Sequence, residues 1–500
     1  MKAPRLVVGE DLPGRFLAAA ALAVALALMA GLAVLVVWTA ARGFWPKPLE
    51  LMTLADGTQV LGQVWEREPS ADGASEQLRL KVGNRDIWGT DFRVISQSQV
   101  VQTERPPRAW ALERWEYGDF FGFPVALDVA GTRLASEAPG FDRKVRETLA
   151  LLAERRRKAE RLGARLARKG EASPEELATL SELREQLEGC TLVMAAASGE
   201  ERQLPCAQVI RARPLNGLGF LGKLKVFGER WLEFLTSEPR ESNTEGGIFP
   251  ALFGTALLVL LMTLGVVPLG VFTAVYLREY ARPGPWTRAV RLAVGTLAGV
   301  PSIVFGAFGL AFFVYTVGGT VDRLFFAESL PTPTFGTGGI LWAAATLALL
   351  TLPVVVVATE EGLAAAPLEV REGAMAMGAT RWETLRWAVL PYAKPGIFTG
   401  MILAVARAAG EVAPLMLTGV VKLAPALPLD GTPPFFHLER KFMHLGFHIY
   451  DLGFQSPNVE AARPAVFATT LVLLLLVLVL NLLALVLRNR ARARVAWHVL

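Results

Sequence analysis

The sequence predicts an α-helical membrane protein with six spans that also carries a separate α+β domain on one side of the membrane. Three observations indicate this. The chain of 500 residues is 52% hydrophobic and only 19% charged, which is too apolar for an ordinary soluble protein of several domains. Its apolar residues come in runs of about 20, the length that crosses a bilayer as a helix. One long polar stretch, residues 41–247, separates the first run from the other five.

The six apolar runs are the predicted spans, and they cover residues 16–40, 248–276, 292–317, 338–358, 395–417 and 464–487. The first run is too long for the core of a signal peptide, and no small-residue cleavage site follows it. We therefore expect an uncleaved anchor, with residues 1–40 forming the cytoplasmic N-terminus and the first span.

Positive charge predicts the orientation of the spans. The net charge of +5 would suggest nucleic acid as a partner in a soluble protein. Here the Arg and Lys residues cluster in alternate connectors, at 278–291 and 371–394, and in the tail 488–500. Because Arg and Lys mark the cytoplasmic side, we expect both termini in the cytoplasm and residues 41–247 outside it.

The outer region is predicted to begin with β-hairpins. Alternating apolar residues on both sides of Asp56-Gly57 predict one hairpin over residues 49–66. A similar pattern around Gly83-Asn84 predicts a second hairpin over residues 78–94. The region is therefore expected to contain a β-sheet.

Helices are predicted in the second half of the outer region. Leucines at helical spacing predict an antiparallel helical hairpin over residues 142–189. Its second helix opens with Ser173-Pro-Glu-Glu, a capping box with Pro at the first helical position. Residues 219–237 place their aromatic side chains on one side, just before the second span. We expect this segment to be a helix on the outer membrane surface.

The chain has two cysteines, Cys190 and Cys206, and both fall in the predicted outer region. An oxidising compartment permits a disulfide there. We hypothesise that the two form a bond that ties the end of the helical hairpin to the next strand; two free thiols are the alternative.

A charged, helix-prone segment lies between the fourth and fifth spans, over residues 359–394, which we call the coupling loop. Helix formers precede Gly378, a predicted helix stop. A second helical run follows from Arg381 and is expected to end at Pro391. A helix–Gly–helix of this kind at the membrane face can dock a soluble partner, whereas the alternative is an ordinary amphipathic interfacial helix.

Arg407 and Glu411 are the strongest candidates for a site inside the membrane. Both lie in the predicted fifth span at i, i+4 spacing, so a continuous helix would place them on one face. Ionisable side chains in a span face a pathway or one another. Arg can donate two hydrogen bonds to one oxyanion, so we expect a role on a translocation path; a self-neutralised pair that joins helices is the alternative.

Other patterns point to no cofactor in this chain. His444 and His448 are spaced i, i+4, so a metal site is conceivable, but His also fills polar edges of membrane-face loops, and we expect no metal. Residues 217–224 nearly spell a phosphate-binding loop. They lack the hydroxyl that holds magnesium and lie on the wrong side of the membrane for ATP, so we expect ATP and magnesium to be used by another chain.

The coupling loop resembles the EAA loop of permeases of ABC importers. The resemblance rests on Glu372-Gly373-Ala374, Gly378 and Leu390-Pro391, with Gly373 in place of the usual Ala. In that family the loop docks into a groove of the ATPase subunit. The resemblance implies that docking here involves Glu372, Gly373, Ala374, Gly378, Ala379, Thr380, Trp382 and Pro391.

Two further motifs resemble the PstA-type permeases of the phosphate-specific (Pst) transporters. Ala406-Arg407 with Gly410-Glu-Val-Ala-Pro-Leu415 is similar to one family element, with Val412 replacing the usual Thr. Residues 299–309, Gly-Val-Pro-Ser-Ile-Val-Phe-Gly-Ala-Phe-Gly, are similar to another, and Pro301 within them predicts a helix kink inside a span. The match covers about residues 243–490.

The resemblance implies a type I ABC importer permease. Residues 248–487 would then be the permease core, with five spans and the coupling loop, in a bacterial inner membrane. The implied partners are a PstC-type permease, a dimer of PstB-type ATPases and a periplasmic PstS-type phosphate-binding protein. Arg407 and Glu411 would line the pathway of the anion. The resemblance assigns no activity to residues 41–247.

Two other functions stay open. A permease for another oxyanion, sulfate or molybdate, would carry a similar coupling loop. A membrane sensor is a weaker alternative, because a sensor needs an output domain and the longest predicted cytoplasmic segment is the coupling loop. An enzyme is disfavoured, since no nucleophile–base or metal signature with suitable spacing occurs in the sequence.

Overall fold

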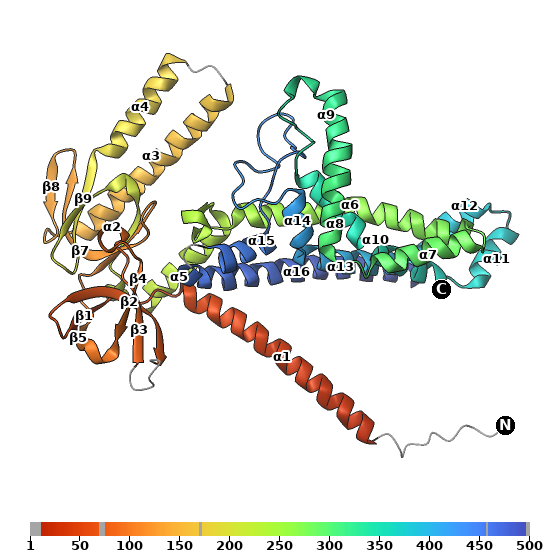
Figure 1. Cartoon of the computed structure of the whole chain (residues 1–500), viewed down its shortest axis with the longest axis horizontal. Coiled ribbons are helices and arrows are strands. Elements are labelled where there is room, and N and C mark those ends of the chain that lie inside the picture. Colours follow the sequence, from red (N-terminus) through yellow and green to blue (C-terminus); the bar gives the residue numbers. More distant parts are fainter. Residues whose placement is uncertain (1–11, 70–75, 170–172, 457–458, 497–500) are drawn as a thin grey trace. The chain divides into compact units, whose positions relative to one another are not determined.

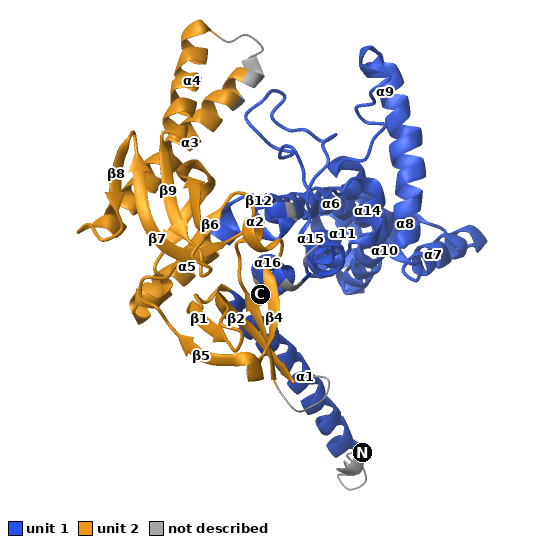
Figure 2. Ribbon diagram, turned by 60° about the vertical axis from the view of Figure 1, so that its left-hand side comes forward, with its two compact units in different colours: residues 1–43, 233–500 blue, residues 44–232 orange. Residues whose placement is uncertain are grey.

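The computed structural model describes residues 12–69, 76–169, 173–456 and 459–496. The chain folds as two compact units (Figure 2). Unit 1 comprises Met1–Gly43 and Glu233–Leu500, and unit 2 comprises Phe44–Leu232. Each unit is described by itself.

Unit 2 begins with an antiparallel five-stranded sheet in the order β4-β3-β2-β1-β5 (Figure 1). Its strands are β1 (Glu50–Leu54), β2 (Gln59–Pro69), β3 (Glu76–Lys81), β4 (Phe92–Ser96) and β5 (Val100–Glu104). The predicted first hairpin is correct: Met52 pairs with Val60, and Gly57 adopts a positive φ of 80° in the turn, as glycine does without strain.

The predicted second hairpin is only partly correct. β3 and β4 pair antiparallel, but helix α2 (Arg85–Trp88) stands in their connection, where the sequence predicted strand. Asn84 adopts a left-handed conformation, and its side-chain amide donates to the carbonyl of Phe121 and accepts from its N–H. The turn is therefore held by a neighbouring sheet rather than by local strand pairing.

A second sheet of unit 2 follows the order β10-β9-β7-β6-β11, with β8 paired to β7. Its strands are β6 (Trp110–Arg114), β7 (Phe120–Val129), β8 (Thr132–Ala135), β9 (Cys190–Ala195), β10 (Glu201–Pro205) and β11 (Val209–Arg213). The core between this sheet and α3 (Phe141–Lys169) contains Phe120, Leu192 and Val145, which are fully buried.

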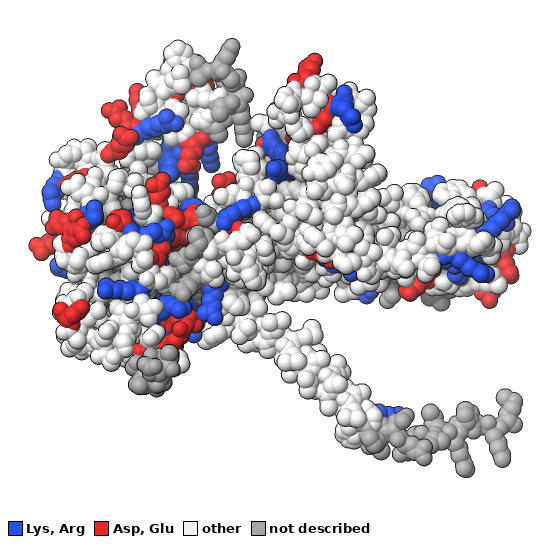
Figure 3. All heavy atoms as spheres, viewed as in Figure 1, with Lys and Arg blue, Asp and Glu red and all other residues white. Residues whose placement is uncertain are grey.

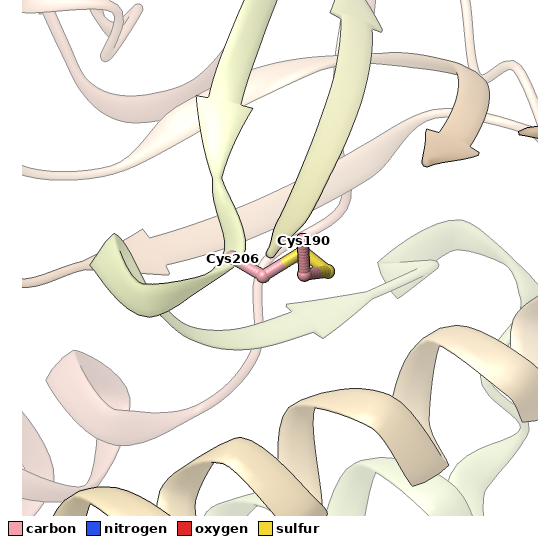
Figure 4. Close-up of a disulfide and its surroundings, with 2 residues drawn as sticks. All are labelled: Cys190 and Cys206. Atoms are coloured by element: carbon pink, nitrogen blue, oxygen red, sulfur yellow. A yellow bond between two sulfur atoms is a disulfide. The ribbon is translucent and has the colours of Figure 1, made fainter. Parts of the chain in front are cut away.

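The helices α3 and α4 (Pro174–Glu188) run side by side and rise from this sheet (Figure 1). The capping box at Ser173 is present, because the Ser173 hydroxyl accepts from the Glu176 N–H while the Glu176 carboxylate accepts from the Ser173 N–H. Below the hairpin, the structure joins Cys190 at the start of β9 to Cys206 (Figure 4).

Helix α5 (Phe220–Thr236) occupies the segment that was predicted as a surface helix. Phe220 and Leu221 are exposed, at 69% and 78%. On the same side as Phe220, Trp231 stacks on Phe44 with ring centres 4.7 Å apart, and Phe227 lies 5.7 Å from Trp45. The helix is therefore amphipathic, and its apolar side is not fully covered within unit 2.

Among the described residues of unit 1, six helical segments are long and apolar enough to cross a membrane. They are Gly14–Phe44, Phe249–Tyr280, Ser302–Phe325, Ile340–Ala364, Arg381–Gly410 and Ala461–Arg490. The surface of this unit is largely uncharged along these segments, and charged side chains gather at the end that carries α11 and α12 (Figure 3). Six spans were predicted, and the multi-pass character is confirmed.

Several helices make up these segments. They are α1 (Leu12–Phe44), α6 (Phe249–Val275) with the π-helical turn η5 (Tyr276–Tyr280), α8 (Ser302–Phe308), η6 (Gly309–Gly318) and α9 (Gly319–Phe325), α10 (Ile340–Ala364), α12 (Arg381–Glu383), η8 (Thr384–Val389) and α13 (Leu390–Gly410), and α16 (Val459–Ala496). Between them lie β12 (Pro239–Arg240), β13 (Glu245–Gly246), α7 (Pro285–Leu297), α11 (Leu368–Ala376), α14 (Ala413–Thr418) and α15 (Leu445–Tyr450).

The third span differs from its prediction. Residues 285–297 form the separate amphipathic helix α7, and the apolar segment starts only at Ser302. Pro301 therefore does not kink a continuous helix; it stands in extended backbone directly before α8 and separates the two helices. The physical reason is local, because Pro has no N–H to continue a helix and disfavours helical backbone at the preceding residue.

The core of unit 1 is built by close contact of α6, α10 and α13, with small residues at the crossings. A Cβ on Gly396 of α13 would lie 2.6 Å from the Cα of Gly362 and 2.7 Å from the carbonyl of Ala358, both on α10. Small residues allow helix backbones to approach closely in membranes, where van der Waals contact replaces the hydrophobic effect.

Candidate functional site

The coupling loop forms a surface-exposed helix–turn–helix at one end of unit 1 (Figure 1). α11 ends at Ala376, and Gly378 follows with a φ of +87°, a left-handed conformation that glycine favours. The Gly378 N–H donates to the Met375 carbonyl at 3.0 Å, which closes the end of the helix. The predicted stop at Gly378 is therefore correct.

The second helix of the loop starts with a capping box that was not predicted from the sequence. The Thr380 hydroxyl accepts from the Glu383 N–H at 3.3 Å, and the Glu383 carboxylate accepts from the Thr380 N–H at 2.8 Å. The signal was available, because Thr and Glu three residues apart before a helical run are typical of this cap.

Seven of the eight predicted docking residues lie on this surface, whereas Pro391 is half-buried in α13. Glu372, Gly373, Gly378, Thr380 and Trp382 are exposed, and Ala374 and Ala379 are half-buried. Trp382 exposes 54% of its surface and Met377 89%, so apolar side chains project from the loop. An exposed apolar group ringed by polar residues is typical of a protein-interaction site.

Two boundaries of the coupling loop were predicted wrongly. α10 continues to Ala364, beyond the predicted loop start at residue 359. The second helix does not end at Pro391 but runs on as α12, η8 and α13 to Gly410. The π-helical turn η8 directly before Leu390 widens the backbone there, and a wider turn accommodates a residue that lacks an N–H.

Arg407 and Glu411 are brought together, but not in one helix as predicted. α13 ends at Gly410, and Glu411 has extended backbone with a ψ of 132°. Pro414 explains this end, because its missing N–H would leave the carbonyl of Gly410 without a helical partner. The Arg407 Nε still lies 3.6 Å from Glu411 Oε1, with the two side chains 40% and 21% exposed. Arg407 is thus held by a carboxylate and remains partly accessible to an anion.

His444, one of the two histidines considered for a metal site, serves as a helix cap. In the described part of the chain, no group of three His, Cys, Asp or Glu side chains could hold a metal ion. His444 caps α15, its Nδ1 accepting from the Gly446 N–H at 3.1 Å. Burial lowers the pKa of His444 to about 4. His437 lies 3.1 Å from Glu439 and 3.4 Å from Asp430.

Two buried carboxylates near the ends of the spans were missed by sequence reasoning. Asp322 accepts from the N–H groups of Phe335 and Gly336 at 2.8 and 2.7 Å. Asp451 accepts from the Asn243 side chain at 2.9 Å and lies 3.1 Å from the Lys422 ammonium. Their partners are 13 to 208 residues away, so no local pattern could have revealed them.

Known proteins share the region that contains this site. The family model described as "Binding-protein-dependent transport system inner membrane component" matches residues 266–493. The chain is 32% identical over 264 residues to the probable ABC transporter permease protein YqgI of Bacillus subtilis, covering 51% of this chain and 83% of that protein. The chain belongs to the family of ABC transporter permeases.

This permease is also similar to phosphate permeases. It is 40% identical over 172 residues to the phosphate transport system permease protein PstA of Mycobacterium leprae, covering 34% of this chain and 51% of that protein. It is 34% identical over 202 residues to the permease protein PstC of Mesorhizobium japonicum, covering 38% and 61%. The permease spans about half the length of the first curated relatives that it matches. The resemblance to PstA-type permeases and the fold of a type I ABC importer permease are confirmed.

Proposed function

We propose that this permease is the membrane-spanning subunit of an ATP-driven importer of inorganic phosphate and forms half of its translocation pathway. The observation that carries the proposal is the similarity to PstA. The family model matches residues 266–493, which hold the coupling loop and Arg407. ATP hydrolysis belongs to a separate subunit in this proposal, and the chain itself is not an enzyme.

The coupling loop is the proposed docking surface for that ATPase. Its helix–Gly–helix is exposed, capped at both inner ends and lined with apolar side chains. A stiff, protruding element of this kind can carry a displacement, which a flexible connector would absorb. The proposed mechanism is alternating access, in which closure of two ATPase subunits moves the coupling loops and rocks the two permeases between inward and outward openings.

Arg407 is the proposed contact for the anion on the pathway. A guanidinium matches the geometry of an oxyanion and keeps its charge at any physiological pH. Glu411 holds it at 3.6 Å without burying it. We therefore expect Arg407 to supply positive potential for the passing phosphate, with Glu411 positioning it.

The proposed partners follow from the same similarity. They are a PstC-type permease, a dimer of PstB-type ATPases and a periplasmic PstS-type binding protein that delivers phosphate. The proposed location is a bacterial inner membrane, with both termini in the cytoplasm and residues 41–247 in the periplasm. The clusters of Arg and Lys at 278–291 and 371–394 support this orientation.

Uptake of labelled phosphate tests the substrate. Cells that lack their own high-affinity system would receive this chain with its operon partners, and unlabelled sulfate and molybdate would serve as competitors. We expect uptake that phosphate alone competes and that Arg407→Gln abolishes. Competition by sulfate or molybdate would favour the other oxyanions, and uptake that survives Arg407→Gln would make Arg407 a helix-joining residue.

Co-purification with the ATPase tests the docking surface. We expect Glu372→Lys to lose the ATPase, because it reverses a charge in the exposed loop. Glu154→Lys, an equal change on the exposed side of α3 in unit 2, is the control and should retain it. If no ATPase accompanies the wild-type chain, the weaker alternative of a membrane sensor gains weight.

A further inference from the structure

Two arginines, Arg371 of α11 and Arg291 of α7, each contact the end of the α6 segment and the end of α10. Arg371 of α11 donates from Nη1 to both carboxylate oxygens of Glu279, each at 2.7 Å. Its Nη2 donates to the carbonyl of Leu363 at 2.8 Å. Glu279 belongs to η5, at the end of the α6 segment, and Leu363 belongs to the end of α10.

Arg291 of α7 makes the reciprocal pair of contacts. Its Nη2 donates to the carbonyl of Leu277 in η5 at 3.0 Å, and the same atom lies 3.4 Å from the carboxylate of Glu360 on α10. Each arginine thus contacts a backbone carbonyl at one of two helix ends, those of the α6 segment and of α10, and a carboxylate at the other. We call the four side chains Arg371, Glu279, Arg291 and Glu360 the arginine clamp.

Electrostatics favours arginine at these positions. Carbonyls in the last turn of a helix carry partial negative charge and lack helical partners, so cations are stabilised there. The guanidinium is planar and can serve a carboxylate and a carbonyl at once from a fixed fork.

The two halves of the clamp differ in strength. Arg371 and Glu279 are 19% and 18% exposed, so water and salt screen their ion pair only weakly. Arg291 and Glu360 are 47% and 23% exposed, and their separation is longer. Breaking a well-buried pair leaves an unpaired charge, whereas an exposed pair is worth little. The Arg371–Glu279 half should therefore dominate.

We propose that the arginine clamp transmits displacement of α11 to the ends of α6 and α10. α10 is already joined to α11 through the short connector 365–367, but α6 is linked to it only through space, and Glu279 lies 92 residues from Arg371. In this proposal, a displacement of the coupling loop also displaces the end of α6, because Arg371 joins the two. The four side chains are positioning residues, and this inference rests on the proposed docking of an ATPase at the loop.

The test uses the complete transporter, purified and reconstituted in vesicles, with Arg371→Gln, Glu279→Gln and the double variant. We expect each single variant to lower phosphate uptake about tenfold while the ATPase still co-purifies and still hydrolyses ATP. Uptake per ATP hydrolysed falls accordingly, which a purely structural role would not produce. The double variant should be no worse than the worse single variant, because both remove one interaction.

Matched controls lie beside each clamp residue. Arg278→Gln and Glu361→Gln change exposed neighbours of Glu279 and Glu360, and both should leave uptake per ATP unchanged. Glu360→Gln should reduce uptake less than Glu279→Gln. If the single variants do not accumulate in the membrane, the exchanged pair Glu279→Arg with Arg371→Glu is measured, and restored accumulation and uptake support the clamp.

Several outcomes would overturn the clamp. Uptake per ATP could be unchanged in Arg371→Gln or Glu279→Gln, the effects could multiply in the double variant, or the exchanged pair could restore nothing. Loss of the ATPase from Arg371→Gln would also overturn it, because Arg371 would then belong to the docking contact itself. Failure of the docking proposal is distinguishable, because the wild-type chain would then bring no ATPase with it.

Discussion

Units 1 and 2 differ in how much of their apolar surface they bury. In unit 2, large side chains such as Phe120, Leu192 and Met194 close over one another and are fully buried, while charged pairs such as Lys81–Asp119, 2.6 Å apart, lie outside the core. In unit 1, only 11% of the apolar stretch of α16 and 6% of that of α1 is buried, against 67% for α10. Helices α1 and α16 therefore expose most of their apolar residues, whereas α10 buries most of its own.

The difference shows what each unit requires from its surroundings. The core of unit 2 is complete within one chain and suits an aqueous compartment. Unit 1 exposes long apolar side chains that need lipid or another subunit, and its internal contacts depend on small residues. Large-to-small changes should therefore damage unit 2, and small-to-large changes should damage unit 1.

The largest expected effect is in the core of unit 2. Phe120→Ala removes a fully buried ring, and we expect it to lower the free energy of unfolding of this unit by about 3–5 kcal/mol. Val101→Ala on β5 is the control, because Val101 is 71% exposed and should change the value by less than about 0.5 kcal/mol. Protease resistance of residues 44–232 during denaturation of the full chain measures both. Similar losses in the two variants would contradict a closed core.

The bond between Cys190 and Cys206 should contribute a somewhat smaller amount. It closes a loop with a sequence separation of 16, for which the lost entropy of the unfolded chain corresponds to about 3 kcal/mol. Replacing both residues by Ala should lower the unfolding midpoint of unit 2, and reduction should have no further effect on that variant. Mass mapping without reductant that finds both thiols free in the wild-type chain would contradict the bond.

Unit 1 should respond to the opposite kind of change. Gly396→Ala places a methyl group 2.6 Å from the Cα of Gly362, so α13 must move from α10, and we expect a loss of about 1–3 kcal/mol. Gly265→Ala is the matched control in α6, where the nearest atom would be 3.9 Å away. Thermal unfolding of the purified protein in detergent compares them. Equal midpoints would show that the α10–α13 contact tolerates widening.

The last expected effect is a pH dependence of unit 1. Burial lowers the pKa of His444 from 6.5 to about 4, because it disfavours the charged imidazole. Its contribution to stability is therefore fully present above about pH 6.5 and is lost as the pH falls towards 4. The unfolding midpoint of the wild-type protein should fall more over this window than that of His444→Asn, which keeps an acceptor for the Gly446 N–H. Parallel pH profiles would exclude His444 as the source.

Local sequence patterns predicted much of the fold. The apolar runs predicted six spans, Asp56-Gly57 predicted the first hairpin, and Ser173-Pro predicted the start of α4. In the site, Gly378 predicted the turn of the coupling loop. These features depend on spacing, turn residues and caps within a few positions, and such short-range preferences are carried by the residues themselves.

Errors arose where a proline acts with its surroundings. Pro391 was expected to end a helix, yet η8 accommodates it, whereas Pro301 was expected to bend a helix and instead separates two. Pro414 ends α13 at Gly410, so Arg407 and Glu411 meet across a helix end. The rule that Pro removes one hydrogen bond is general, but whether the chain widens, breaks or turns depends on what packs beside it.

The sequence by itself predicted a multi-pass membrane protein with six apolar segments, the place of most of these segments and the turn at Gly378. Only the tertiary structure decided that Arg371 reaches Glu279, that Asn243 reaches Asp451, and that Gly396 lies against Gly362. Hydropathy and helix caps are local properties that can be read along the chain. Partners 92 or 208 residues apart are chosen by how the helices pack, which no local pattern specifies.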